Sequence, residues 1–248
     1  MRWHVLTLNT MSRALFITGT DTEIGKTTTT AALAQVAMAA GYTAAALKPI
    51  AAGLYWHEGQ WLNDDVEALR ASCHPALDAA AICPMALKAA CAPHIAAQQE
   101  GRVFDRGALV AHVRQHQAHA DLTLVEGVGG FCVPLSDDFS TADWALDLGL
   151  DVVLVVGLRL GCLNHAILTT QAIQSKGLRL RAWVANTLQP DMPYLADNIT
   201  YLRSYFAQKG VAYWGHLPRL SALPSSPQFL AQVNPHLSAF KYWLQTSE

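Results

Sequence analysis

The chain has 248 residues, of which 52% are hydrophobic and only 15% are charged, and its formal net charge is −2. The chain lacks the excess of basic residues with which proteins bind the phosphate backbone of nucleic acid, so this composition excludes a nucleic-acid-binding protein. The longest apolar run, residues 152–158, is too short to cross a membrane, and the total length suits one large α/β domain.

The N-terminus shows neither a structural pattern nor a secretion signal. It has no apolar segment followed by a small-residue cleavage site, so we expect a cytoplasmic protein. Residues 1–10 are predicted to be an extension that is either disordered or not native, because Met11-Ser12-Arg13 would make a natural start. A single domain is expected over residues 11–248.

Short apolar runs rich in β-branched residues alternate with helical stretches along the chain. Strands are predicted at residues 14–18, 43–47, 122–125, 152–156, 181–185 and 211–214. Helices are predicted at residues 26–40, 64–72, 105–119, 163–176, 193–209 and 228–245. This alternation predicts an α/β fold with a mostly parallel sheet and helices on both faces. Ligands of such sheets bind beyond the carboxyl ends of the strands.

A phosphate-binding motif follows the first predicted strand. Residues 19–28 read Gly-Thr-Asp-Thr-Glu-Ile-Gly-Lys-Thr-Thr and lead into an alanine-rich helix. The core Gly25-Lys26-Thr27 is intact, although the usual upstream glycine is displaced by one position to Gly19. In this motif the loop amides hold phosphate oxygens, the lysine neutralises their charge and the threonine hydroxyl coordinates Mg²⁺. An ordinary strand-to-helix turn is the alternative, but the context predicts a P-loop NTPase-like fold.

A second lysine stands at the end of the second predicted strand. Lys48 is followed by Pro49, which would hold the lysine towards the crevice, where another ammonium would stabilise a transferring phosphoryl group. The alternative is a surface lysine. Further on, Asp64 and Asp65 open a predicted helix, and one of them either caps that helix or provides a Mg²⁺ ligand.

The third predicted strand ends in an acidic residue and a glycine-rich loop, residues 126–130. The carboxylate of Glu126 can reach a Mg²⁺ ion held by Thr27, and the glycines allow the backbone to approach a phosphate or a substrate closely. A tight turn without this function is the alternative.

The five cysteines and a histidine trio suggest neither a disulfide framework nor a metal centre. The cysteines are odd in number and show no C-x-x-C spacing, so we expect them to be reduced. His112, His116 and His119 have helical spacing, but no carboxylate joins them at a ligand spacing. We therefore expect a solvated helix face.

Taken together, these motifs resemble the dethiobiotin synthetase family. The matching segments are residues 19–27, 48–51, 65 and 125–130, with further matches at 155–157, 160–166 and 183–186. The resemblance extends from about residue 11 to residue 227. It implies a homodimeric cyclo-ligase of biotin biosynthesis that closes the ureido ring of dethiobiotin from 7,8-diaminononanoate, CO₂ and MgATP. The implied intermediates are a carbamate and a carbamic–phosphoric mixed anhydride, and the implied partners are small molecules and a second copy of the chain.

The resemblance also implies a role for individual residues. The implied catalytic residues are Lys48, Lys26 and Thr22, and the implied Mg²⁺ ligands are Thr27, Asp65 and Glu126. The implied ATP site comprises Glu23, Ile24, Gly25, Lys26, Thr27, Thr28, Asp65, Glu126, Gly127, Val128, Gly129, Asn186, Thr187, Pro218, Arg219 and Leu220. The implied substrate site comprises Thr22, Lys48, Ala52, Gly129, Gly161, Cys162, Leu163 and Asn164.

The chain departs from the family pattern at several positions. Ala52 replaces a serine, Asn198 a tyrosine, Ser225 a glutamate and Thr187 an aspartate. These changes concern nucleotide selectivity and substrate affinity rather than the phosphate chemistry. Two alternatives therefore stay open. One is a dimeric ATPase switch of the partitioning type, whose loop carries a second lysine at the position of Asp21, and the other is a degenerate nucleotide-binding paralogue.

Overall fold

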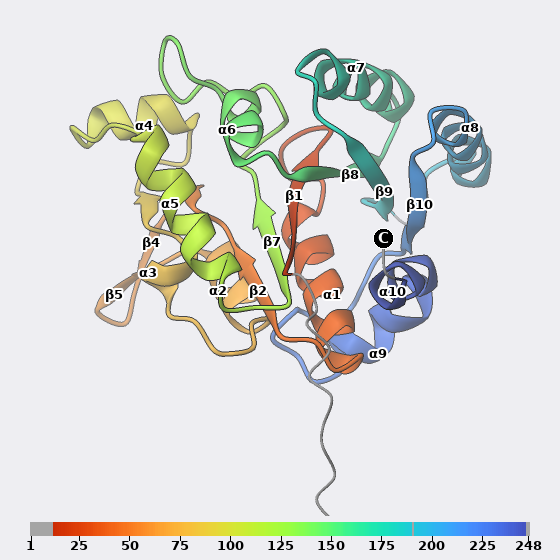
Figure 1. Cartoon of the computed structure of the whole chain (residues 1–248), viewed down its shortest axis with the longest axis horizontal. Coiled ribbons are helices and arrows are strands. Elements are labelled where there is room, and N and C mark those ends of the chain that lie inside the picture. Colours follow the sequence, from red (N-terminus) through yellow and green to blue (C-terminus); the bar gives the residue numbers. More distant parts are fainter. Residues whose placement is uncertain (1–11, 190, 247–248) are drawn as a thin grey trace, which may run out of the picture.

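The computed structural model describes residues 12–189 and 191–246, so the expectation for residues 1–10 lies outside the described residues. Six strands form the central sheet in the order β10-β9-β8-β1-β7-β2, and every neighbouring pair is parallel (Figure 1). The strands are β1 (Arg13–Gly19), β2 (Ala44–Leu47), β7 (Leu122–Glu126), β8 (Asp151–Leu158), β9 (Leu180–Thr187) and β10 (Ala212–Leu217). The predicted parallel α/β sheet is confirmed.

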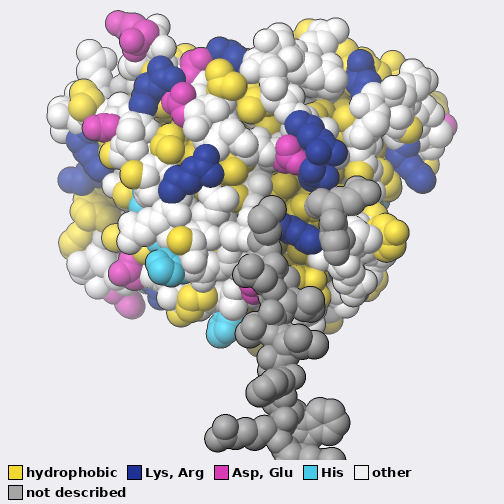
Figure 2. Space-filling model, in the orientation of Figure 1, with side chains coloured by type: hydrophobic (Ala, Val, Ile, Leu, Met, Phe, Trp, Pro, Cys, Tyr) yellow, Lys and Arg dark blue, Asp and Glu magenta, His cyan; other side chains and the backbone are white. Residues whose placement is uncertain are grey.

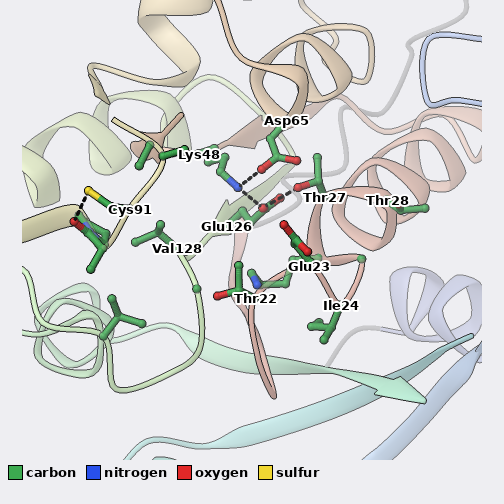
Figure 3. A pocket seen from close by; sticks show the side chains of 18 residues that line it. Thr22, Glu23, Ile24, Thr27, Thr28, Lys48, Asp65, Cys91, Glu126 and Val128 are labelled. Atoms are coloured by element: carbon green, nitrogen blue, oxygen red, sulfur yellow. Dashed lines mark hydrogen bonds and ion pairs between the residues drawn. The ribbon is translucent and has the colours of Figure 1, made fainter. Parts of the chain in front are cut away.

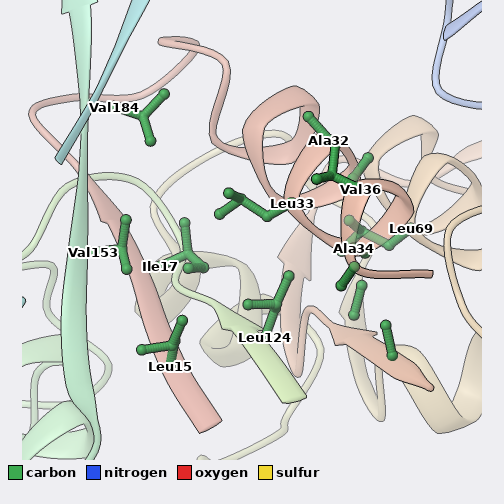
Figure 4. Close-up of a cluster of buried hydrophobic side chains, with 14 of the residues drawn as sticks. Leu15, Ile17, Ala32, Leu33, Ala34, Val36, Leu69, Leu124, Val153 and Val184 are labelled. Carbon is green, nitrogen blue, oxygen red and sulfur yellow. The ribbon is translucent and has the colours of Figure 1, made fainter. Parts of the chain in front are cut away.

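Each face of the sheet is covered by its own helices because successive side chains of a strand point to opposite faces. Leu15 and Ile17 pack into one core, shown in Figure 4, whereas Phe16 packs into the other. The first core is covered by α1 (Lys26–Ala39), α2 (Asp64–Arg70), α9 (Phe229–Val233) and α10 (Ser238–Gln245). The second is covered by α5 (Arg106–Gln117), α6 (Thr141–Leu148), α7 (Cys162–Ser175) and α8 (Leu195–Ala207).

Small elements that the sequence did not predict fill the segment between β2 and β7. β3 (Ile50–Ala52) pairs in parallel with β6 (Met85–Leu87), and β4 (Tyr55–His57) forms a hairpin with β5 (Gln60–Leu62). Two short helices, α3 (Ala79–Ile82) and α4 (Pro93–Gln99), complete this segment. The pairing of β3 with β6 brings the residues around position 90 back towards the end of β2.

Two helix predictions are corrected. The single helix over residues 228–245 is wrong, because a 3₁₀ turn at Asn234–His236 separates α9 from α10. Pro235 in that turn lacks the amide proton that a continuous helix needs. The histidine trio does not share a helix either, because α5 ends before His119.

The surface agrees with the small net charge. On the face shown in Figure 2, Lys and Arg side chains are scattered among Asp, Glu and hydrophobic side chains. Within the part of the chain that the structure describes, no helix has the length and apolar character needed to span a bilayer.

Candidate active site

The phosphate-binding loop joins β1 to the N-terminus of α1. Gly25 precedes the helix in a left-handed conformation, with φ 84° and ψ 31°. The first bond of the helix ladder is donated by Thr29 to the carbonyl of Gly25, so the amides of residues 26–28 have no partner within the helix. None of the described side chains caps this end of the helix. Free amides and the positive end of the helix dipole together form an anion site.

Lys26 lies across this loop with only 6% of its surface exposed. Its Nζ donates to the carbonyl of Asp21 at 2.8 Å. Burial lowers the pKa of Lys26 to about 8, and the attraction of Glu126 only partly offsets this effect. A bound polyphosphate would favour the charged ammonium and would therefore raise this pKa.

Lys48 is held between two carboxylates. Its Nζ lies 2.6 Å from Oδ2 of Asp65 and 2.6 Å from Oε1 of Glu126 (Figure 3). Lys48 and Glu126 are buried, whereas the Asp65 side chain is 45% exposed. Burial alone would lower the pKa of Lys48, but Glu126 and Asp65 together raise it above the ordinary value. Burial likewise would raise the pKa of Asp65, but the ammonium of Lys48 holds it below the ordinary value. Lys48 and Asp65 are therefore ionised at neutral pH.

The sheet register explains why these residues meet. β2 pairs with β7 so that Leu47 lies opposite Val125, which places Lys48 beside Glu126 at the same edge of the sheet. Asp65 reaches the cluster from the first turn of α2. Asn63 caps that helix by accepting from the amides of residues 65 and 66 at 3.1 and 3.3 Å.

The choice between Asp64 and Asp65, which the sequence left open, is decided by the start of α2. Asp65 faces Lys48, whereas Asp64 accepts a hydrogen bond from the hydroxyl of Tyr55 at 2.7 Å. Capping falls to Asn63 rather than to either aspartate. Asp65 is thus the carboxylate that reaches the phosphate-binding loop.

The oxygen atoms around Lys48 are of the kind that Mg²⁺ binds. The hydroxyl of Thr27 donates to Oε1 of Glu126 at 2.8 Å, and Oε2 of Glu126 is buried without a hydrogen-bond partner among the described residues. The described residues contain no group of three or more His, Cys, Asp or Glu side chains placed to hold a metal. One hydroxyl and two carboxylates suit a Mg²⁺ ion that completes its shell with water and phosphate oxygens.

A cavity of about 730 Å³ opens beside this cluster. Its lining combines the phosphate-binding loop, the Lys48 cluster and two loops beyond them. The lining residues are Thr22, Glu23, Ile24, Gly25, Lys26, Thr27, Thr28, Lys48, Ala52, Asp65, Ala90, Cys91, Ala92, Pro93, Glu126, Val128, Gly129 and Val133. Sequence reasoning missed residues 90–93 and Val133. Only Pro93 carried a signal, as a residue favoured in the first turn of a helix.

Comparison with known proteins places this geometry in a family. A family model described as an AAA domain (AAA_26) matches residues 13–232, most of the chain. The chain belongs to this AAA domain family. Together with the free amides above α1, this makes it a P-loop protein that binds nucleotide.

Solved structures share the fold at low sequence identity. The pnob8 ParA structure aligns with a TM-score of 0.56 at 13% identity, over 94% of this chain and 100% of that chain. The septum site-determining protein MinD from Pyrococcus horikoshii OT3, solved with Mg-ADP, aligns with a TM-score of 0.51 at 15% identity, over 95% and 90%. At such identities the similarity establishes the P-loop NTPase fold alone.

Several residues of the predicted site lie outside the cavity of this P-loop protein. Asn186 and Thr187 end β9, where Asn186 bonds the phosphate-binding loop and Thr187 bonds the ring of His216 at 2.7 Å. Residues 161–164 form the start of α7, and residues 218–220 follow β10. Gly127 also does not line the cavity. The roles of these residues in binding base and substrate stay predictions.

Proposed function

We propose that this chain is an ATP-dependent dethiobiotin synthetase, converting 7,8-diaminononanoate, CO₂ and ATP to dethiobiotin, ADP and phosphate. The AAA_26 family includes dethiobiotin synthetase-like P-loop NTPases, and the motifs of the chain resemble that enzyme. The observation that carries the proposal is the buried Lys48, held beside the phosphate-binding loop at the wall of a cavity that extends well beyond the loop. A site for hydrolysis alone does not need a cavity that extends beyond the phosphate-binding loop.

The proposed reaction has three steps that conserve atoms and charge. One amine nitrogen of the substrate attacks CO₂ and loses a proton, which gives a carbamate. A carbamate oxygen then attacks the γ-phosphorus, the bond to the β-phosphate oxygen breaks, and ADP leaves. Finally the second amine attacks the carbonyl carbon of the mixed anhydride, loses a proton and expels phosphate, which closes the ring.

The residues of the chain contribute position and charge to these steps. Lys26 and Lys48 stabilise the negative charge of the transferring phosphoryl group from two sides, and Thr22 at the cavity wall contacts the carbamate. Because a carbamate already carries its negative charge, the phosphoryl step needs no general base. Thr27, Asp65 and Glu126 would hold Mg²⁺, which neutralises the phosphate oxygens when bound.

We further propose that the enzyme works as a homodimer. Exposed apolar side chains lie on and near α7 and α8, which is where the family resemblance expects the partner subunit. They are Leu160, Leu168, Tyr194 and Tyr201. Light scattering coupled to gel filtration tests this proposal, and a monomeric mass at assay concentration would refute it.

A dimeric ATPase switch is the second candidate, favoured by the fold shared with ParA and MinD. In that class the phosphate-binding loop supplies the second lysine at the position occupied here by Asp21. Asp21 instead forms an ion pair with Arg159. This pairing and the Lys48 cluster favour the synthetase.

One assay separates the two candidates. Purified protein is incubated with MgATP and bicarbonate, with and without 7,8-diaminononanoate, while ADP and dethiobiotin are followed by mass spectrometry. The synthetase predicts product and ADP in equal amounts, dependent on the diamine. ATP hydrolysis that is indifferent to the diamine and yields no dethiobiotin would refute the synthetase and favour the switch.

A further inference from the structure

The carbonyl oxygen of Ile24 accepts no hydrogen bond from the backbone of α1. The helix ladder of α1 begins with the bond from Thr29 to the next carbonyl, that of Gly25, so Ile24 lies one residue too early to join it. Ile24 is buried, with 1% of its surface exposed. A buried carbonyl without a hydrogen bond is costly, so a partner must come from elsewhere in the fold.

Asn186 supplies that partner from the end of β9. Its Nδ2 donates to the carbonyl of Ile24 at 2.9 Å across 162 positions of sequence, and Asn186 itself is 7% exposed. Only the NH₂ group of the amide can face a carbonyl oxygen, so this contact fixes the orientation of the amide. The side chain thus ties the phosphate-binding loop to a strand of the central sheet.

Three glycines leave the space that Asn186 and Ile24 occupy. A Cβ atom on Gly25 would lie 2.1 Å from Nδ2 of Asn186, so the amide rests directly against the glycine whose left-handed backbone opens the helix. The side chain of Ile24 packs in the same way against two other glycines. A Cβ on Gly157 of β8 would lie 2.6 Å from it, and one on Gly19 would lie 2.7 Å from it.

We propose that Asn186 is a positioning residue of the phosphate-binding loop, holding the backbone of residues 24–25 so that the amides of residues 26–28 point at the bound phosphates. The proposal rests on the nucleotide-binding role of the loop and not on the diamine reaction. It differs from the adenine contact that the family resemblance implies for Asn186, because the amide donor acts on the loop rather than on the base.

The test compares a ligand that has a base with one that has none. Affinities for MgATP and for magnesium tripolyphosphate are measured by calorimetry on wild-type protein, Asn186→Ala and Asn186→Leu, well below their unfolding temperatures. The leucine keeps the branched shape of the side chain but can neither donate a hydrogen bond nor carry a charge, so it separates the hydrogen bond from the packing. We expect both variants to lose about tenfold in affinity for both ligands, the effect of one hydrogen bond.

Ser175→Ala is the control. Its hydroxyl also donates to a backbone carbonyl, that of Ala172 at 2.9 Å, but at the exposed C-terminal end of α7. It should leave both affinities at the wild-type value.

Three outcomes would overturn the proposal. If the Asn186 variants lose affinity for MgATP alone, the residue contacts the base and does not position the loop. If the variants melt earlier but bind both ligands as tightly as wild type when folded, the role is only structural. If wild-type protein binds neither ligand, the inference fails together with the nucleotide site, whereas a failure to make dethiobiotin leaves these affinities untouched.

Discussion

Removing the ammonium of Lys48 should destabilise the free protein and make its stability depend on Mg²⁺. In Lys48→Met the apolar stem is kept, but the fully buried carboxylate of Glu126 loses the cation 2.6 Å away. Removing one partner of a buried ion pair lowers the free energy of unfolding by about 3–5 kcal/mol. Because Asp65 is 45% exposed, water can screen that carboxylate, so we expect a loss near the lower end, about 3 kcal/mol.

Mg²⁺ should restore much of this stability because it can take the place of the ammonium between the same carboxylates. In wild-type protein the ion must first displace Lys48, so MgCl₂ should stabilise the variant more than the wild type. Urea unfolding at neutral pH measures both effects, with and without MgCl₂ and with NaCl of equal ionic strength as the control. Turnover of the variant should collapse, as an independent readout of the proposed catalytic role.

The double variant Lys48→Met/Glu126→Gln sharpens the test. It leaves no unpaired buried charge, so it should recover most of the lost stability and respond little to MgCl₂. The reasoning would be refuted if Lys48→Met unfolds within about 0.5 kcal/mol of wild type, the usual range of a neutral surface change. Equal stabilisation of wild type and variant by MgCl₂ would refute it as well.

Three further predictions follow from single contacts. Burial lowers the pKa of Lys26 to about 8 and bound phosphate raises it, so nucleotide binding near that pH should take up a proton and weaken as the pH rises. Calorimetry in two buffers of different ionisation enthalpy measures the uptake, and an uptake of zero contradicts the assignment. Gly25→Ala should abolish nucleotide binding, because the added Cβ would clash with Asn186. Gly41→Ala is the control: this residue also has a positive φ but lies in open space, so the variant should lose only about 1–2 kcal/mol of stability. Asn63→Ala should lose ~1 kcal/mol in urea unfolding and weaken Mg²⁺ binding, because the helix that Asn63 caps carries Asp65, a proposed Mg²⁺ ligand. An unchanged Mg²⁺ affinity would contradict that link.

Much of the fold and of the phosphate site was predictable because its signals are local. Continuous apolar runs marked the six central strands, and the order strand, glycine loop, helix marked the loop around Lys26. The three-residue strands β3 to β6 were missed because segments this short are too brief to show an alternation of hydrophobic and polar residues. Helix α6 was missed although Ser140 and Asp143 form a capping box before it, a signal the sequence did contain.

By itself, the sequence determined the fold class, the phosphate-binding loop and the presence of Lys48 and Glu126 at strand ends. Only the tertiary structure decided that these two residues, 78 positions apart, form one ion cluster with Asp65. It also decided that Asn186 bonds the loop 162 positions before it. The reason is physical. Hydrophobic period and backbone preferences act over a few neighbouring residues, whereas the order of strands in a sheet sets which strand ends meet, and that order depends on the packing of the whole domain.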